Sequence, residues 1–157
     1  MLSVFLLLLA PQPSPEAVAP WAVARQSEDS VLAVDLSSIR SNAEGRFLVT
    51  VTTVYPVRTD RLTPRDPKAL AYSLQTYEAD CARRAFRGLD WRWTAVDGSV
   101  LSEGGDAEGP FYRAHPSDDG GAVVERVCAA GAAATPGKSH AEFVAEAQRF
   151  FRVGEWR

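Results

Sequence analysis

The sequence predicts an α+β fold, in which an antiparallel β-sheet has a helix fastened to it by one disulfide, with an additional C-terminal helix. From Trp21 onward, short runs rich in Val, Thr, Tyr and Trp alternate with Gly, Pro, Asn and Asp clusters, which is typical of antiparallel strands joined by turns. Two later segments carry apolar residues at helical spacing instead. The two cysteines, Cys81 and Cys128, end a strand-like and a helix-like segment respectively.

The first strands are expected at residues 21–25 and 31–35, as a hairpin that turns at 27–30. The strongest strand pattern covers residues 46–57, where one face carries Phe47, Val49, Val51, Thr53 and Tyr55. This face is more apolar than the other, so we expect it to look into the core. Three prolines then predict a loop, because proline cannot donate to a β-ladder.

A further pair of strands is expected at residues 70–80 and 86–96. In the second of them, Trp91 and Trp93 share a face with Leu89. Large aromatics at alternating positions are more often core than the lining of a ligand cleft, and we predict core. Asp97-Gly98 is a hairpin signal, with the return strand starting at residues 100 and 101. Residues 103–110 are expected to be an acidic loop, and 111–115 a final short strand.

Two helices follow. Ser117-Asp118-Asp119 supplies a capping side chain and acids for the first helix, while the Gly120-Gly121 pair weakens its first turn. Its apolar stripe consists of Val123, Val124, Val127 and Cys128. The second helix is expected from a Ser139 cap to about residue 153, with an apolar face of Phe143, Val144, Ala147, Phe150 and Phe151.

We interpret Cys81 and Cys128 as one disulfide. Closing a loop of roughly 48 residues removes about 4 kcal/mol of disorder from the unfolded chain. Structural disulfides persist in oxidising compartments, so this interpretation predicts a protein outside the reducing cytosol. The alternative is two free buried cysteines that behave as small hydrophobes. A metal site needs further ligands, and His115 and His140 stand in no ligand spacing, so no metal or other cofactor is expected.

The N-terminal part reads as a targeting region. Residues 1–10 form an apolar, signal-like segment that is too short to span a bilayer. Residues 11–20 are a Pro-rich linker. We expect one α+β domain over residues 21–130, then a linker and C-terminal helix over 131–157. The expected location is exported, in the periplasm or at the cell surface.

Charge and apolar patterning suggest two candidate contact surfaces. The net charge of -3 argues against a nucleic-acid partner, which needs a clustered basic face. One candidate is the basic loop of Arg58, Arg61, Arg65 and Lys68, for which a solvated loop is the simpler reading. The other is the helix face of Phe143, Phe150 and Phe151, which would dock on a partner or on a second copy, giving a homodimer.

No motif predicts catalysis. The segment 135–139 resembles a phosphate-binding loop, but the required first glycine is replaced by Ala132. A GxSxG elbow for a catalytic serine is absent, and His115 precedes Pro116 in a turn. Capping explains the adjacent carboxylates Asp118 and Asp119. We therefore expect a protein that is not an enzyme.

The order of several motifs resembles the surface-adhesin protein E family of bacterial exported proteins. These motifs are Trp21, the segment 35–39, the strand 49–54, Tyr72-Ser73-Leu74, residues 77–81, Asp97-Gly98 and Val127-Cys128. The resemblance runs from Trp21 to Cys128, about two thirds of the chain. Phe111-Tyr112 stands where the family usually has a tryptophan.

The resemblance implies an antiparallel sheet with a helix fastened to it by the Cys81 to Cys128 disulfide, and it implies no chemistry. It also implies a protein-binding or adhesion module, because the best-known member attaches bacteria to host extracellular-matrix and plasma proteins. A second hypothesis is a periplasmic structural or assembly factor, which would bind an envelope protein through an open sheet edge or the C-terminal helix.

Overall fold

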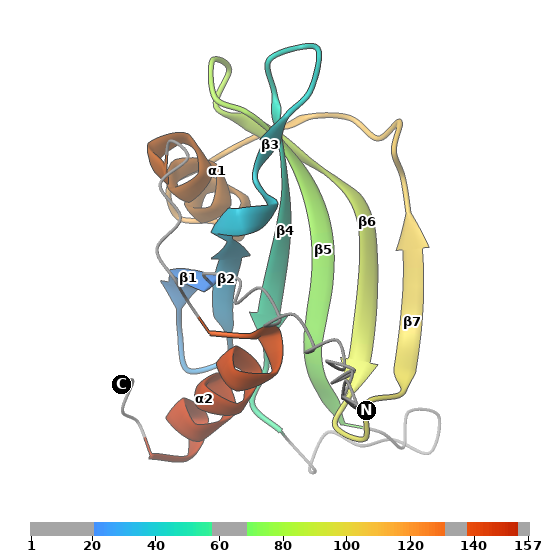
Figure 1. The fold of residues 1–157 in the computed structure, drawn as a ribbon, viewed down its shortest axis with the longest axis vertical. Coiled ribbons are helices and arrows are strands. Elements are labelled where there is room, and N and C mark those ends of the chain that lie inside the picture. The colour runs from blue at the N-terminus through green and yellow to red at the C-terminus, as the bar shows by residue number, and fades with distance from the viewer. Residues whose placement is uncertain (1–20, 58–68, 131–137, 154–157) are drawn as a thin grey trace, which may run out of the picture.

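The structure, a computed structural model, describes residues 21–57, 69–130 and 138–153. It is an antiparallel sheet with two helices (Figure 1). The strands are β1 (Trp21–Gln26), β2 (Val31–Asp35), β3 (Arg40–Ser41), β4 (Phe47–Val54), β5 (Leu70–Asp80), β6 (Ala85–Ala95), β7 (Val100–Gly105) and β8 (Tyr112–Arg113). A 3-10 turn, η1 (Leu36–Ser38), follows β2, and the helices are α1 (Asp119–Ala130) and α2 (His140–Val153).

The sheet order is β1-β2-β4-β5-β6-β7, while β3 pairs with β4 and β8 pairs with β6. Each pairing is antiparallel, as short connections between successive strands favour. The predicted α+β class is therefore confirmed, as are the first hairpin and the strand at residues 70–80.

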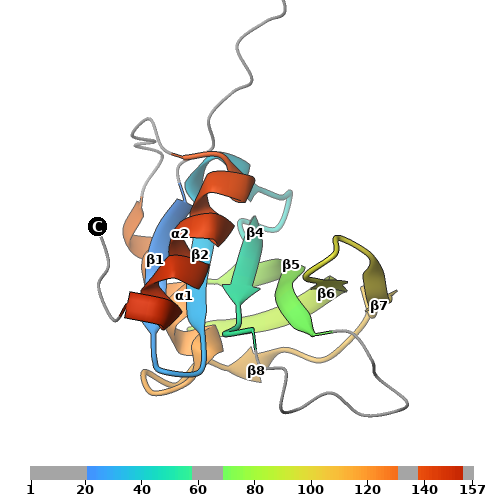
Figure 2. The same cartoon turned by 90° about the horizontal axis from the view of Figure 1, so that it is seen from below.

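The two helices pack on opposite faces of the sheet (Figures 1 and 2), with α1 against β1, β2 and the start of β6, and α2 against β2 and β4. Under α1 lies a first cluster, which includes Leu32, Val34, Val49, Val51, Val123, Val124 and Val127. Under α2 lies a second cluster, built from Val31, Ala33, Val54, Phe143 and Ala147. Alternate residues of β2 point into the two clusters, so this strand is buried on both faces.

Both faces of β4 look into a core, whereas the sequence predicted this for only one of them. Val49 and Val51 lie in the first cluster, as predicted. Thr52 and Val54, on the opposite face, are also 0% exposed. The reason is non-local, because α2 returns from the end of the chain to cover that second face.

The disulfide is present and joins Cys81, directly after β5, to Cys128 in α1, with the two Cα atoms 5.7 Å apart. It fastens the helix to the sheet, as predicted. The helix cap differs in detail, because Oδ1 of Asp118, and not the Ser117 hydroxyl, accepts from Gly121 N at 2.5 Å. At α2 the predicted Ser139 cap is found, reciprocated by Glu142, whose Oε2 accepts from Ser139 N at 2.8 Å.

The end of the sheet away from the helices differs from the sequence prediction. Asp97-Gly98 forms the expected turn, where Asp97 Oδ1 accepts from Ser99 N at 3.0 Å. The return strand β7 then extends through Gly105, so residues 103–105 belong to a strand and not to a loop. The final strand β8 is shorter than predicted, at Tyr112–Arg113.

Candidate functional site

The β1 edge of the sheet is closed. A register shift between Val23 and Arg25 marks a β-bulge, and Nη2 of Arg126 on α1 donates to the Val23 carbonyl oxygen at 2.5 Å. Trp21 and Val23 also pack against the second cluster. Bulges and helix cover are devices that prevent a further strand from pairing. Another chain therefore finds little free backbone at β1.

The β7 edge is open. β7 pairs with β6 through the register from Asp90 opposite Gly105 to Thr94 opposite Val100, and no described residue pairs with its other side. Alternate residues of an edge strand present N–H and C=O groups outward. No helix lies beside β7, and the strand stands at the outer side of the sheet (Figure 1). The two edges thus differ in their availability to a partner.

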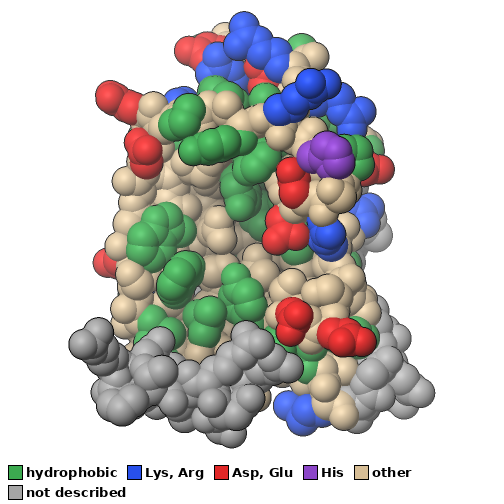
Figure 3. All heavy atoms as spheres, turned by 180° about the vertical axis from the view of Figure 1, so that it is seen from behind, with side chains coloured by type: hydrophobic (Ala, Val, Ile, Leu, Met, Phe, Trp, Pro, Cys, Tyr) green, Lys and Arg blue, Asp and Glu red, His purple; other side chains and the backbone are tan. Residues whose placement is uncertain are grey.

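Beside the open edge lies an aromatic strip, defined here as Trp91 and Trp93 of β6. Their ring centroids are 5.4 Å apart, and Trp93 is 45% exposed. The expectation that both rings are core is wrong for Trp93. Helix α1 packs beside Phe86 at the start of β6 and leaves Trp93 exposed. From behind, hydrophobic side chains gather over the uncovered strands (Figure 3).

Because Gly104 has no side chain, the indole of Trp91 can lie across β7 at this position. A Cβ atom built on Gly104 would lie 2.8 Å from Cζ2 of Trp91 and 3.3 Å from its Nε1. Any other residue at this position would therefore push the ring aside. Because Trp91 and Gly104 are paired across the strands, the indole reaches from β6 over β7 toward the open edge.

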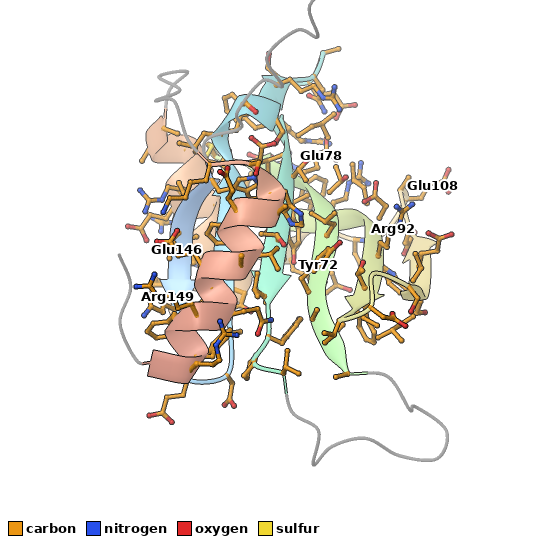
Figure 4. All side chains as sticks on the ribbon, turned by 60° about the horizontal axis from the view of Figure 1, so that its bottom comes forward. Tyr72, Glu78, Arg92, Glu108, Glu146 and Arg149 are labelled. Carbon is orange, nitrogen blue, oxygen red and sulfur yellow. A yellow bond between two sulfur atoms is a disulfide. The ribbon has the colours of Figure 1, made fainter. Side chains whose placement is uncertain are left out.

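The same strands carry a shallow hollow of about 500 Å³. Its lining includes Thr50, Leu74, Thr76, Arg92 and Glu103, together with Trp91 and Gly104. Nε of Arg92 donates to Oε2 of Glu103 at 3.1 Å across β6 and β7, which satisfies both charges in part. Tyr72 on β5, between this hollow and α2, and Arg92 nearer the edge are labelled in Figure 4. The hollow provides hydrogen-bonding groups from threonine, arginine and carboxylate side chains.

His140 attaches α2 to the sheet. Its ring lies 5.0 Å from Trp21 and 4.9 Å from Tyr72, and its Nε2 is 3.1 Å from the hydroxyl of Thr52. Burial lowers the pKa of His140, and the nearby charge of Asp35 offsets this only in part. The Thr52 side chain is 0% exposed and donates to the Ser73 carbonyl oxygen at 2.9 Å. This pair is a structural contact, because substrate has no access to the hydroxyl.

Glu78 is a carboxylate held inside the upper part of the sheet (labelled in Figure 4). It is 3% exposed and accepts from Nε of Arg87 and from Nδ2 of Asn42, both at 2.6 Å, with Arg46 at 3.4 Å. Burial raises the pKa of Glu78, but the hydrogen bonds and the charge of Arg87 outweigh it and the pKa lies below its ordinary value. The guanidinium groups of Arg46 and Arg87 lie 4.7 and 4.8 Å from the ring centroid of Phe111. The cluster therefore fixes the segment before β8.

The contact surfaces predicted from the sequence are placed as follows. The basic loop of Arg58, Arg61, Arg65 and Lys68 lies outside the described residues. Phe143 is 2% exposed and stacks with Trp21, so it belongs to the interior and is not available to a partner in this fold. Phe150 and Phe151 are half-buried and pack against the same cluster. Docking of those two rings on a partner stays a prediction.

Within residues 21–57, 69–130 and 138–153, no group of three or more His, Cys, Asp or Glu side chains is arranged to hold a metal ion. No helix in those ranges is long and apolar enough to cross a membrane.

The phenol of Tyr77 keeps its proton at neutral pH. Burial raises the pKa of Tyr77 to about 12, and the charge of Asp119 and then Tyr55 add to this effect.

Sequence reasoning proposed an open sheet edge without locating it at β7, and it missed the exposed tryptophan. A signal for the edge was present, because the alternation of Trp91 and Trp93 opposite the small residues Ser102 and Gly104 matches a continued strand pair. Because Gly104 and Gly105 were interpreted as loop residues, the strand β7 was not predicted to extend this far. No local signal distinguishes an exposed tryptophan from a buried one.

No protein-family model matches this sequence, and neither does any curated protein. Among solved structures, the chain is similar to protein E from non-typeable Haemophilus influenzae, with a TM-score of 0.42 and 12% sequence identity. The similarity covers 90% of this chain and 94% of that chain. This resemblance is weak, and family membership does not follow from it.

Proposed function

We propose that the chain is an exported, non-enzymatic protein-binding module of the adhesion type, and that it holds its partner at the β6–β7 end of the sheet. One observation carries the proposal. In the part of the chain that the structure describes, β7 is an unpaired edge beside the exposed aromatic strip, whereas β1 is closed by a bulge and by Arg126. Exposed aromatic rings beside free main-chain groups are typical of protein-binding surfaces.

A role without catalysis is supported by the surroundings of the reactive side chains. The imidazole of His140 contacts a buried hydroxyl, and the phenol of Tyr77 has a raised pKa. The carboxylate of Glu78 is enclosed by two guanidinium groups. Each of these groups contacts other side chains of the fold.

Export is supported by the disulfide and by the apolar residues 1–10. The disulfide between Cys81 and Cys128 is compatible with long-term stability in an oxidising compartment, such as the periplasm or the cell exterior. An apolar N-terminal segment followed by prolines resembles a secretory signal and its linker. The proposed partners are therefore host extracellular-matrix or plasma proteins, which a surface protein meets.

The test measures retention of the purified protein on wells coated with extracellular-matrix extract or with plasma proteins. The wild type should be retained, and Trp93→Ser should lower the retention roughly tenfold or more, because buried aromatic anchors dominate such interfaces. Tyr112→Ser is the matched control, since Tyr112 is 58% exposed on β8. Equal retention of the two variants contradicts the proposal.

A periplasmic assembly factor is the second candidate, and the open edge suits it equally, since envelope partners often add a strand to a sheet. The two candidates differ in where the edge is displayed. Protease treatment of intact cells should digest an adhesin and spare a periplasmic factor. Digestion only after the outer envelope is opened would favour the assembly factor.

A further inference from the structure

We infer that the partner binds as an extended segment that adds a strand to β7, and that this segment carries Lys or Arg side chains. The inference rests on the proposed function and names the chemistry of its partner. An added strand gains affinity from main-chain hydrogen bonds, and it gains specificity from side chains that alternate between the two faces of the sheet. Each of these features has a counterpart at β7.

The main-chain counterpart is the outer side of Val100–Gly105. This strand is 6 residues long and pairs only with β6 among the described residues. A strand of this length spans roughly 20 Å, which accommodates an extended segment of about six residues. The strand contains no proline and no lysine, the residues that commonly block an edge. Its backbone is therefore suited to pairing.

The charge around this edge is acidic. Residues 89–110, which include the turn and the loop that flank β7, contain the acidic residues Asp90, Asp97, Glu103, Asp106 and Glu108, and Arg92 is the one basic residue. The Glu103 side chain is 61% exposed and pairs with Arg92, whose one positive charge leaves the acidic residues of this region in excess. Figure 4 shows Glu108 at the same outer side of the sheet as Arg92. A residue on an added strand directly opposite Glu103 would have its Cβ about 5 Å away, and a cation there is favoured.

The other face of the edge also favours a cation. Gly104 follows Glu103, so its position faces the opposite side of the sheet, where the Trp91 indole lies across it. A side chain opposite Gly104 on an added strand meets this ring. Lys and Arg bind the face of tryptophan favourably, and Arg also stacks on it. Glu103 on one face of the edge and the Trp91 indole on the other therefore both favour a segment that carries Lys or Arg.

The same charges argue against a second copy of this chain as the occupant. If two β7 edges paired about a two-fold axis, each Glu103 and its acidic flanks would approach their own copies. Like charges that face each other across strands are destabilising. The acidic edge also repels phosphate groups. A basic protein segment remains the occupant that the edge fits.

The probe is a nine-residue peptide, blocked at both ends, in which pairs of Lys alternate with pairs of Thr, so that lysines lie on both faces of the added strand. A twin peptide replaces each Lys by Glu, and a second twin has every backbone nitrogen methylated. Affinity is measured by calorimetry on the full chain, and amide hydrogen exchange is followed at residues 100–105. The Lys peptide should bind and protect amides of β7. The methylated twin should bind at least about tenfold more weakly, because two or more main-chain hydrogen bonds are lost, and the Glu peptide should not bind detectably.

Two variants test the two faces of the edge. Glu103→Gln should weaken binding of the Lys peptide several-fold, and Gly104→Ala should do the same because the new Cβ displaces the Trp91 ring. Glu125→Gln is the matched control, since Glu125 is an exposed acid on α1 at the other end of the sheet. Equal binding of the Lys and Glu peptides would overturn the selection for cations. Binding that is unaffected by methylation and leaves β7 unprotected would overturn strand addition.

The outcomes separate this inference from the proposed function. If no peptide binds but coated wells still retain the protein in a manner sensitive to Trp93→Ser, the inference is wrong and the function stands. If the wells do not retain the protein either, the proposed function is wrong as well. Peptide binding without retention on the wells supports the inference and redirects the search to envelope partners.

Discussion

At the scale of single residues, His140 makes the attachment of α2 dependent on pH. Its pKa is lowered, from an ordinary value of 6.5, so the unfolded chain binds a proton more readily than the folded one. The free energy of unfolding should therefore fall as the pH drops from about 6.5 toward the folded pKa, and stay constant below it. Denaturant unfolding at pH 8.0 and pH 5.0 measures this loss.

His140→Gln removes the titrating group while keeping a donor for the Thr52 hydroxyl. In this variant the decrease of stability between pH 8.0 and pH 5.0 should be smaller than in the wild type. The two proteins should differ less at pH 5.0 than at pH 8.0. An unchanged decrease would mean that other groups cause it.

Glu78 provides a second prediction at this scale. Glu78→Gln leaves the shape nearly unchanged but removes the charge that pairs with Arg46 and Arg87. Leaving partly buried guanidinium groups without their carboxylate should cost about 2–3 kcal/mol of unfolding free energy. Because the folded pKa is lowered, the contribution of Glu78 is present above pH 4.5 and is lost as the pH falls through the folded pKa.

Chemical denaturation at pH 7 measures the cost of Glu78→Gln. The exposed pair Arg92 and Glu103 provides the control, since Glu103→Gln should change stability by less than about 1 kcal/mol. A Glu78→Gln variant as stable as this control would show that the buried cluster is not stabilising.

At the scale of elements, the start of α1 depends on two glycines. A Cβ atom on Gly121 would lie 1.8 Å from the His115 carbonyl oxygen, and one on Gly120 would lie 2.0 Å from the Phe86 ring. The sequence suggested that this pair only weakens the helix. In the structure, the missing side chains let the helix approach both the chain before it and β6.

Gly121→Ala should therefore destabilise the protein by about 1–3 kcal/mol, although alanine is the better helix former by about 1 kcal/mol. The clash is with backbone, which cannot rotate away. Gly88→Ala is the control, because its Cβ would meet only Tyr77 Cε1, at 3.9 Å. Thermal unfolding compares them, and a Gly121→Ala protein with a raised midpoint would contradict the close approach.

At the scale of the whole molecule, the disulfide connects the end of β5 to α1 across a sequence separation of 47 residues. Cys81→Ser should cost about 4 kcal/mol in the chain-entropy account. Cys128→Ser should cost a similar amount, and the double variant little more than either one, because each single change already breaks the bridge. Additive losses would count against this account.

Reduction supplies the control for this series. A reducing agent should shift the unfolding midpoint of the wild type toward that of the double variant and leave the double variant unchanged. A shift of the double variant under reduction would point to another effect of the reagent. Equilibrium unfolding in denaturant, with and without reductant, measures all of these differences.

Much of the fold follows from local patterns in the sequence. Alternation along residues 47–54 and 70–80, the Asp97-Gly98 turn and the Ser139 cap each act within a few residues, and the structure contains all of them. The cysteines were also paired correctly, since each closes an element whose apolar side faces the same core. Among the candidate contact residues, Phe143 is interior. The basic loop lies outside the described residues, so its role as a contact surface stays a prediction.

The sequence by itself therefore determined most of the strands, both helices and their link, because hydrogen bonding and side-chain alternation are short-range. The tertiary structure alone decided which surfaces remain free. The two helices bury β2 on two faces, and Arg126 of α1 blocks the β1 edge. Trp93 and β7 stay uncovered toward the opposite edge. The exposure of a residue depends on where distant segments pack, and its own neighbours in the chain do not encode that position.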